Sequence, residues 1–307
     1  MTMKIATTIG EVYAYTDQDP VSAVRLYEGT GFRYLDYSFY NVLRGNHPFL
    51  TEAWKTQVDN AGSTAASLGM KFVQAHSPNY NPLGNPGDSS YHEAGMKASL
   101  RSVEACGMLG IGAIVVHSGI TEDYLYPDDK EGYFRANRPF YCALLEEAEK
   151  WNVKVCIENS AEGNMGRRYF YMTAEDMNDF VDYMNHPLLG CCWDVGHGHM
   201  RGTDPCTELT GLGKNLTCVH IHDNMGVRDE HIAPFFGNID MDSILQGLIQ
   251  SGYNGYFTFE SDGFLTASAA HGSGRLKTVP AAVKRASLSL LYQIGKSCLE
   301  AYGIYEE

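Results

Sequence analysis

Six short hydrophobic stretches between residues 70 and 261 each deliver one histidine or acidic residue near their end. The six residues are His76, His117, Glu158, Asp194, His220 and Glu260. Imidazole and carboxylate groups are the side chains that bind divalent cations such as Zn²⁺ and Mn²⁺. Gathering three histidines and three carboxylates at one place without a counter-charge would be costly. The set therefore predicts a bound divalent cation.

A second group of polar residues follows in the expected loops. His197 and His199 come just after Asp194, and His222 and Asp223 follow His220. Asp229 and His231 lie further along the same loop. Together with His197 they could hold a second ion. The alternative, which the sequence leaves open, is a solvated loop or a set of contacts to substrate hydroxyls.

The elements that must position these residues alternate regularly between strand-like and helix-like patterns. Strands are expected at 4–9, 32–38, 70–77, 111–119, 153–160, 188–197, 216–223 and 253–261. Helices are expected at 19–31, 51–69, 91–110, 134–152, 173–185, 204–215, 238–252 and 279–303. This alternation is typical of βαβ units and a parallel sheet.

Eight such units predict an α/β fold, a single (β/α)₈ TIM barrel that spans residues 1–307 as one domain. In that fold the carboxyl ends of the strands meet at one rim, where active sites are built. An open doubly wound sheet is the competing architecture. No GxGxxG motif follows the first strand, which argues against an open sheet of the dinucleotide-binding type.

The composition restricts the class of partner. The formal net charge is −14, which argues against nucleic acid as the main partner, although a small basic groove on an acidic protein remains compatible with it. The eight cysteines form no CxxC pair and are expected to be buried and reduced. The first residues, MTMKIATTIG, do not read as a signal peptide, and no run reaches the roughly 18 apolar residues of a membrane span. A cytoplasmic protein without membrane contact is expected.

Five stretches make the chain resemble the xylose-isomerase-like barrel superfamily: IENS, WDVGHGH, VHIHDNMGVRDEH, FFGNID and GYNGYFTFE. This superfamily groups sugar phosphate isomerases and epimerases with family-two apurinic endonucleases. The resemblance to the sugar-acting members implies one metal ion held by Glu158, Asp194, His220 and Glu260. The resemblance to the endonucleases implies a trinuclear zinc site with further ligands at His76, His117, His197, Asp229 and His231.

The favoured interpretation is a metal-dependent isomerase or epimerase of a sugar or sugar phosphate. The resemblance implies proton transfer through a metal-stabilised enediolate, with Glu158 and Glu260 as the acid/base pair and His197 bonded to a substrate oxygen. Mn²⁺ or Zn²⁺ is the favoured cofactor, with Mg²⁺ or Co²⁺ as alternatives. His76, His117, Asp229, His231 and His222 are additional candidates for contact with metal or substrate.

Two other activities stay open. One is a lyase that cleaves oxidised C-glycosides by the same α-proton chemistry. The tyrosines of the long loops, Tyr80, Tyr91, Tyr124, Tyr126 and Tyr133, would suit a bulky substrate, and a small partner subunit would fit this activity. The other is an apurinic endonuclease, which predicts three zinc ions and a basic groove. His222 counts against it, since the resemblance places an asparagine at that position in the endonucleases. A homo-oligomer is compatible with all three activities.

Overall fold

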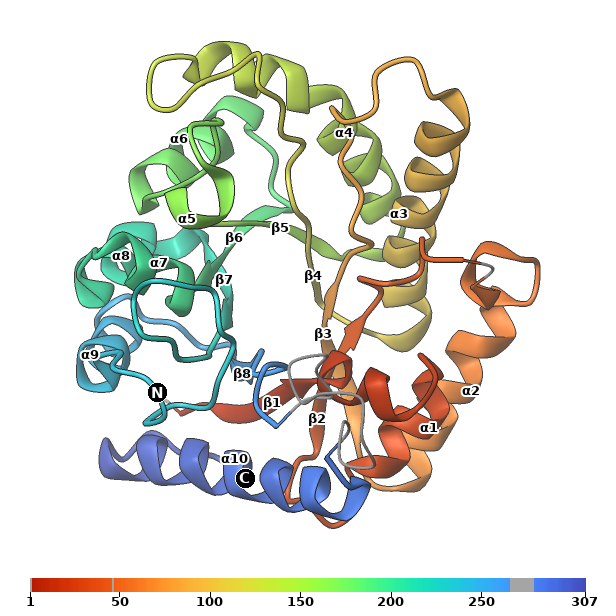
Figure 1. Ribbon diagram of the computed structural model, residues 1–307, viewed down its shortest axis with the longest axis vertical. Coiled ribbons are helices and arrows are strands. Elements are labelled where there is room, and N and C mark those ends of the chain that lie inside the picture. The colour runs from red at the N-terminus through yellow and green to blue at the C-terminus, as the bar shows by residue number, and fades with distance from the viewer. Residues whose placement is uncertain (1, 46, 266–278) are drawn as a thin grey trace.

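The computed structural model describes residues 2–45, 47–265 and 279–307. Its eight strands are parallel and form a barrel surrounded by helices (Figure 1). The strands are β1 (Lys4–Thr8), β2 (Tyr34–Ser38), β3 (Lys71–His76), β4 (Ala113–Val115), β5 (Lys154–Glu158), β6 (Leu189–Asp194), β7 (Leu216–His220) and β8 (Tyr256–Phe259). The predicted (β/α)₈ TIM barrel is confirmed.

The barrel closes between its seventh and eighth strands. The hydrogen-bonded order runs from β7 through β6, β5, β4, β3, β2 and β1 to β8. Closure comes from Ile221, whose N–H donates to Thr258 and whose carbonyl accepts from Glu260. Because this closing contact lies directly beside His220, it fixes the end of β7 against the end of β8, where Glu260 follows.

The helices form the outer layer and leave the strand ends open at one rim. The α-helices are α1 (Pro20–Leu26), α2 (Trp54–Ser67), α3 (Ser89–Leu109), α4 (Lys130–Trp151), α5 (Glu162–Met165), α6 (Ala174–Met184), α7 (Val195–Arg201), α8 (Pro205–Leu212), α9 (Met241–Gln250) and α10 (Ala281–Ala301). Three 3₁₀ turns complete the described elements: η1 (Ile9–Tyr15), η2 (Pro48–Leu50) and η3 (Gly213–Asn215).

Several predicted boundaries were wrong. The sixth strand stops at Asp194 rather than at 197, because the Asp194 carboxylate accepts the N–H of His197 and starts α7. The helix predicted at 19–31 ends at Leu26, since Gly29 and Gly31 take positive φ angles. The strand predicted at 111–119 covers only Ala113–Val115. The elements η1, η2, α5 and α7 were not predicted.

Two separate cores hold the fold together. The larger one lies between the strands and the helices and contains most of the buried aromatic side chains. The smaller one lies inside the barrel and consists of small side chains, Ala113, Val115, Cys156, Cys192 and Cys218. Interiors of this fold more often hold bulky branched residues. The small side chains leave polar residues room directly beneath the rim.

All eight cysteines are free thiols, as predicted, and six of them are buried. Burial raises the pKa of Cys191 and Cys192 well above the ordinary thiol value. Both belong to the wall of β6, but Cys192 faces inward and its Sγ lies within 4.8 Å of ligand atoms of Glu158 and His220. In the described part of the chain, no helix is long and apolar enough to cross a membrane.

Candidate metal centre

The rim of the barrel brings together four of the predicted residues in one cluster, here called the central group: Glu158, Asp194, His220 and Glu260. One ligand atom of each lies within 4.8 Å of the others. His220 Nδ1 is 2.6 Å from Glu158 Oε1 and 3.1 Å from Glu260 Oε2. The two glutamates therefore approach the same histidine from β5 and from the end of β8.

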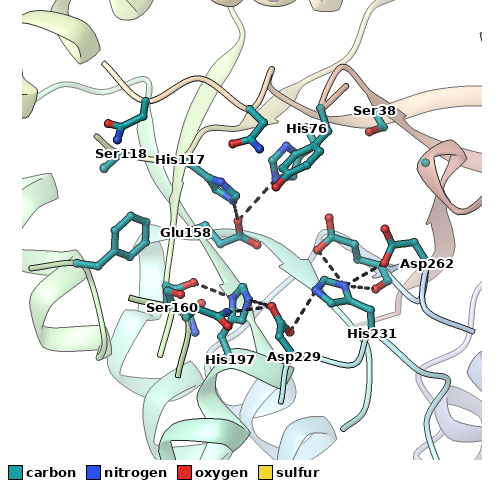
Figure 2. A pocket seen from close by; sticks show the side chains of 18 of the residues that line it. Ser38, His76, His117, Ser118, Glu158, Ser160, His197, Asp229, His231 and Asp262 are labelled. Atoms are coloured by element: carbon teal, nitrogen blue, oxygen red, sulfur yellow. Dashed lines mark hydrogen bonds and ion pairs between the residues drawn. The ribbon is translucent and has the colours of Figure 1, made fainter. Parts of the chain in front are cut away.

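Two further histidines face the other oxygen of Glu158. His117 Nε2 lies 2.6 Å from Glu158 Oε2, and His76 Nε2 lies 3.7 Å from the same atom. His76 ends β3, while His117 lies two residues beyond β4. These three residues form the first side group, and they share Glu158 with the central group (Figure 2).

His197, Asp229 and His231 form the second side group on the opposite flank of Glu158 (Figure 2). His197 Nε2 lies 2.9 Å from Asp229 Oδ2, and His231 Nε2 lies 3.2 Å from Asp229 Oδ1. Asp229 Oδ1 is buried and makes no hydrogen bond within the described residues. The loop after β7 thus places Asp229 and His231 against α7, which carries His197.

The orientation of three histidines fits a divalent cation. Nδ1 of His76, His197 and His231 lies 2.8–2.9 Å from the backbone carbonyls of Ser77, Asn159 and Glu260 respectively. A carbonyl can only accept, so Nδ1 carries the proton in each ring and Nε2 points into the site. Histidines that bind metal ions commonly donate their second ring N–H in this way. The donor set of nitrogen and carboxylate oxygen also suits Zn²⁺ or Mn²⁺.

Without a cation the site is held together by shifted protonation. Burial opposes a charge on His197, but Asp194 and Asp229 outweigh it and raise the pKa of His197 to about 10. Burial also opposes ionisation of Glu158, yet the neighbouring histidines keep its pKa well below the ordinary value. The pKa of Glu260 is lowered as well, chiefly by His220 acting against burial. The glutamates are therefore carboxylates at neutral pH.

We expect the metal-free protein to lose stability as the pH rises above 6.5. His197 has a pKa of about 10 in the folded state and about 6.5 when unfolded. Its contribution is therefore complete below pH 6.5 and disappears as the pH rises through 10, by about 1.4 kcal/mol per pH unit at most. Urea unfolding of chelated protein at pH 7, 8 and 9 measures it. A metal-free protein that is equally stable at all three values contradicts the expectation.

Asn159 and Asp223 support the site and were not recognised as such in the sequence. The Asn159 side chain bonds both the N–H and the carbonyl of Asp194, at 2.6 and 2.9 Å. Asp223 is buried, and its carboxylate accepts four backbone N–H groups, those of Asn224, Phe235, Gly237 and Ile239, at 2.8–3.0 Å. In the sequence, only its position shortly after His220 could have pointed to Asp223. A buried carboxylate in a loop requires hydrogen-bond partners, and the backbone supplies them here.

Replacing Asp223 by asparagine is expected to lower the free energy of unfolding by about 2–4 kcal/mol. In the variant, an NH₂ group replaces one carboxylate oxygen and faces backbone N–H groups, to which it cannot bond. The loop that carries Asp229 and His231 therefore loses part of its anchor. Urea unfolding measures the effect. Asp240→Asn is the matched control, because Asp240 only caps α9 and asparagine caps equally well. Equal stability of the two variants would show that Asp223 does not anchor the loop.

The structure places two of the predicted residues away from the cavity. His222 was a candidate for contact with metal or substrate, but it is fully buried behind Asp194, with Nε2 3.0 Å from both Asp194 carboxylate oxygens. Within the described residues it joins none of the donor groups. Its ring stacks on that of His231 at 4.0 Å. Of the five loop tyrosines, Tyr80 lines the cavity, whereas Tyr133 is completely buried in the outer core.

The cluster forms the floor of a cavity of about 510 Å³ at the rim. Glu158, Glu260, and the residues of both side groups line it, together with asparagine and serine side chains of the loops. The described lining includes no lysine or arginine. A cavity of this size lies within the range of about 300–1,000 Å³ that small-molecule sites occupy.

Comparison with known proteins gives one family and several similar structures. The family described as xylose isomerase-like TIM barrel matches residues 24–279. The structure resembles the D-psicose 3-epimerase of Clostridium cellulolyticum H10, with a TM-score of 0.69 and 19% identity over 99% of this chain and 100% of that one. It also resembles the 3-keto-D-glucoside 4-epimerase YcjR of E. coli, with a TM-score of 0.68 and 17% identity over 95% of this chain and 99% of that one.

Two curated relatives are uncharacterized proteins. Protein y4fM of Sinorhizobium fredii is 26% identical over 55% of this chain, and protein MJ1311 of Methanocaldococcus jannaschii is 27% identical over 52% of this chain. The matches cover 53% and 54% of those proteins, so the chain spans about half the length of the curated relatives. At sequence identities of 17% and 19%, the structural similarities establish the fold only. The activity has to be inferred from the chemistry of the site.

Proposed function

The chain belongs to the xylose isomerase-like TIM barrel family, and from this premise we propose that it is a metal-dependent isomerase or epimerase of a carbohydrate. We further propose that residues 1–307 act as one catalytic domain. The observation that carries the proposal is the central group on the cavity floor, in which two glutamates from β5 and from the end of β8 face one histidine. The names of the epimerases with the same fold support it.

The central group would hold the cation through Glu158, Asp194, His220 and Glu260. A divalent cation at this point would polarise a sugar carbonyl and its neighbouring hydroxyl, which acidifies the proton on the carbon between them. Mn²⁺ and Zn²⁺ suit the donor set best, and Mg²⁺ or Co²⁺ are the alternatives. The remaining chemistry belongs to the side chains of the cavity.

Glu158 and Glu260 are the proposed acid/base pair. Both are ionised at neutral pH because the histidines lower their pKa values, so each can accept a proton from carbon. Since they reach the cavity from different strands, one glutamate would remove the proton, and the other, once it has taken up a proton from water, would return one on the opposite face of the substrate. That sequence inverts the configuration at the carbon and leaves the atoms of the sugar unchanged.

His197 is the proposed partner of a substrate oxygen. It lies on the first turn of α7, and its ring is oriented by the carbonyl of Asn159 and by Asp229. A ring held at both nitrogens cannot rotate away from the cavity. In this role the Nε2–H group that faces Asp229 would be shared with the substrate oxygen whose charge rises as the carbon-bound proton leaves.

A panel of ketoses tests the proposed function. Protein freed of metal and reloaded with Mn²⁺, Co²⁺, Zn²⁺ or Mg²⁺ is incubated with D-fructose, D-tagatose, D-xylulose and 3-keto-D-glucosides. Conversion of at least one sugar to an isomer or epimer, abolished by chelation, is the expected result. If no member of the panel reacts with any of the four metals, while an abasic DNA duplex is cleaved, the proposal is wrong.

One observation favours phosphodiester cleavage at abasic sites as a second candidate function. The two side groups add donor sets to the central group, and Glu158 bridges two of the sets. A cluster of this kind could hold three zinc ions. The net charge of −14 and the cavity lining, which includes no lysine or arginine among the described residues, count against a DNA partner. For this reason the carbohydrate remains the proposed substrate.

A further inference from the structure

The cavity extends well beyond the central group on the side of strands β4 and β5. Ser118 and Ser160 lie on this side, flanking Glu158, whereas Asp262 and His231 lie on the other side (Figure 2). The same lining includes Asn164, Met165 and Phe170, which follow β5. We propose that this part of the cavity, here called the outer subsite, binds a second, uncharged sugar ring, so that the substrate is a glycoside or disaccharide rather than a free monosaccharide.

Ser160 supplies the observation that points to a ligand. Its side chain is buried, with 2% exposed, and it lines the cavity. Its Oγ has no hydrogen-bond partner among the described residues, although its backbone N–H bonds Tyr171. A buried hydroxyl without a partner is costly unless something in the cavity pairs with it. A sugar hydroxyl can both donate to it and accept from it.

The surrounding polar residues are already paired and therefore act as a rigid frame. Asn81 bonds Leu83 and both backbone groups of Ile120, and so ties the loop after β3 to the loop after β4. Ser118 Oγ bonds the hydroxyls of Tyr141 and Tyr171. Ser160 thus stands out in this wall as the hydroxyl left free for a ligand.

The apolar part of the outer subsite suits the face of a sugar ring. Phe170 is buried and lines the cavity, as do Met165 and Ile120. Aromatic and aliphatic side chains beside a few polar groups are typical of small-molecule sites. A phosphate would find no lysine or arginine among the described lining residues, and four carboxylates elsewhere in the same cavity: Glu158, Asp229, Glu260 and Asp262. An uncharged ring therefore fits this wall better than a phosphate does.

The volume of the cavity agrees with two rings. A cavity of about 510 Å³ falls within the range of about 300–1,000 Å³ that sites for drug-sized ligands occupy, and it has room for a second ring beside the first. This inference rests on the proposed function for the position of the first ring, at the central group. The second ring then extends toward Ser160 and Phe170.

Binding of three sugars to the Mn²⁺-loaded protein, measured by isothermal titration calorimetry, tests the inference. The probes are D-fructose and two ketose disaccharides, lactulose and isomaltulose. The wild-type protein is expected to bind at least one disaccharide about tenfold more tightly than D-fructose. Ser160→Ala is expected to weaken that binding about two- to tenfold, the effect of one neutral hydrogen bond, and to leave D-fructose binding unchanged.

Ser102→Ala is the matched control, because Ser102 is a buried serine of α3 whose Oγ bonds Ser99 away from the cavity. Thermal unfolding of both variants tests for a general effect on the fold. Ser160→Ala is expected to leave the melting temperature unchanged, because it removes a hydroxyl that has no hydrogen-bond partner among the described residues. Equal affinity for all three sugars, or equal loss with Ser160→Ala and Ser102→Ala, overturns the inference. If the protein prefers a disaccharide but forms no isomer of any sugar, the outer subsite is supported and only the proposed function is contradicted.

Discussion

Replacing Glu158 by glutamine is expected to lower kcat/KM by at least about 10³-fold and to reduce the metal content of the protein. Glu158 is the residue that the central group and the first side group share, and its two carboxylate oxygens lie 2.6 Å from His220 and from His117. Glutamine fills the same space but carries one acceptor oxygen and no charge. It can neither accept a proton from carbon nor neutralise a cation.

Glu149→Gln provides the control for the loss of a carboxylate at Glu158. Glu149 lies on α4, is exposed, and pairs with His186 far from the cavity. Its replacement should change neither activity nor metal content. Kinetics on each variant, together with element analysis after dialysis, separate the two contributions of Glu158. If Glu158→Gln keeps both the wild-type activity and the wild-type metal content, Glu158 is neither a ligand nor the base.

Removal of the metal is the second change with a large expected effect. Chelation should abolish the isomerase or epimerase activity and lower the free energy of unfolding by about 4 kcal/mol for each ion that is present at about 1,000 times its Kd. The physical reason is that the cation neutralises the carboxylates of the cluster, whose charges otherwise depend on protonated histidines. Differential scanning fluorimetry with increasing Mn²⁺ or Zn²⁺ measures the change.

The metal experiment has an internal control in the choice of cation. Ca²⁺ prefers all-oxygen coordination and is expected to restore neither stability nor activity at a site with this many histidines. Mn²⁺ or Zn²⁺ should restore both. A protein whose thermal stability and activity are the same before and after chelation contradicts metal dependence.

The sequence was sufficient for the barrel and for the residues at its rim. Strand ends in a (β/α)₈ barrel converge by topology, so a histidine or carboxylate near each of six successive strand ends predicts one cluster without any knowledge of distances. His76, Glu158, Asp194 and His220 close their strands, and His117 and Glu260 follow within two residues. The cluster is in this sense a consequence of the strand pattern.

The parts that the sequence did not predict depend on local hydrogen bonds. The helix α7 begins directly after Asp194, because the Asp194 carboxylate caps it and the strand therefore does not continue. The burial of His222 follows from its pairing with that same carboxylate. Asp223 organises its loop through four N–H groups that come from up to sixteen residues away. Such partners become visible only when the backbone path of the loop is known.

The cavity wall escaped prediction for a related reason. Tyr133 belongs to the same tyrosine-rich segment as Tyr124 and Tyr126, yet it points into the outer core because α4 starts at Lys130, earlier than its sequence pattern suggested. Ser160 and Phe170 carry no distinctive motif. Their importance comes from an unpaired Oγ and from the lining of the cavity, and both are properties of the folded chain.

The most direct test of the proposed function is solvent deuterium incorporation into a ketose. Mn²⁺-loaded protein is incubated in D₂O with the ketose that reacts best, and the product is examined by ¹H and ²H NMR. The account predicts an isomer or epimer with one deuterium at the carbon next to the carbonyl, and no deuterium with Glu158→Gln. An unlabelled product, or equal labelling by the wild type and by Glu158→Gln, would contradict proton transfer by the glutamates of the central group.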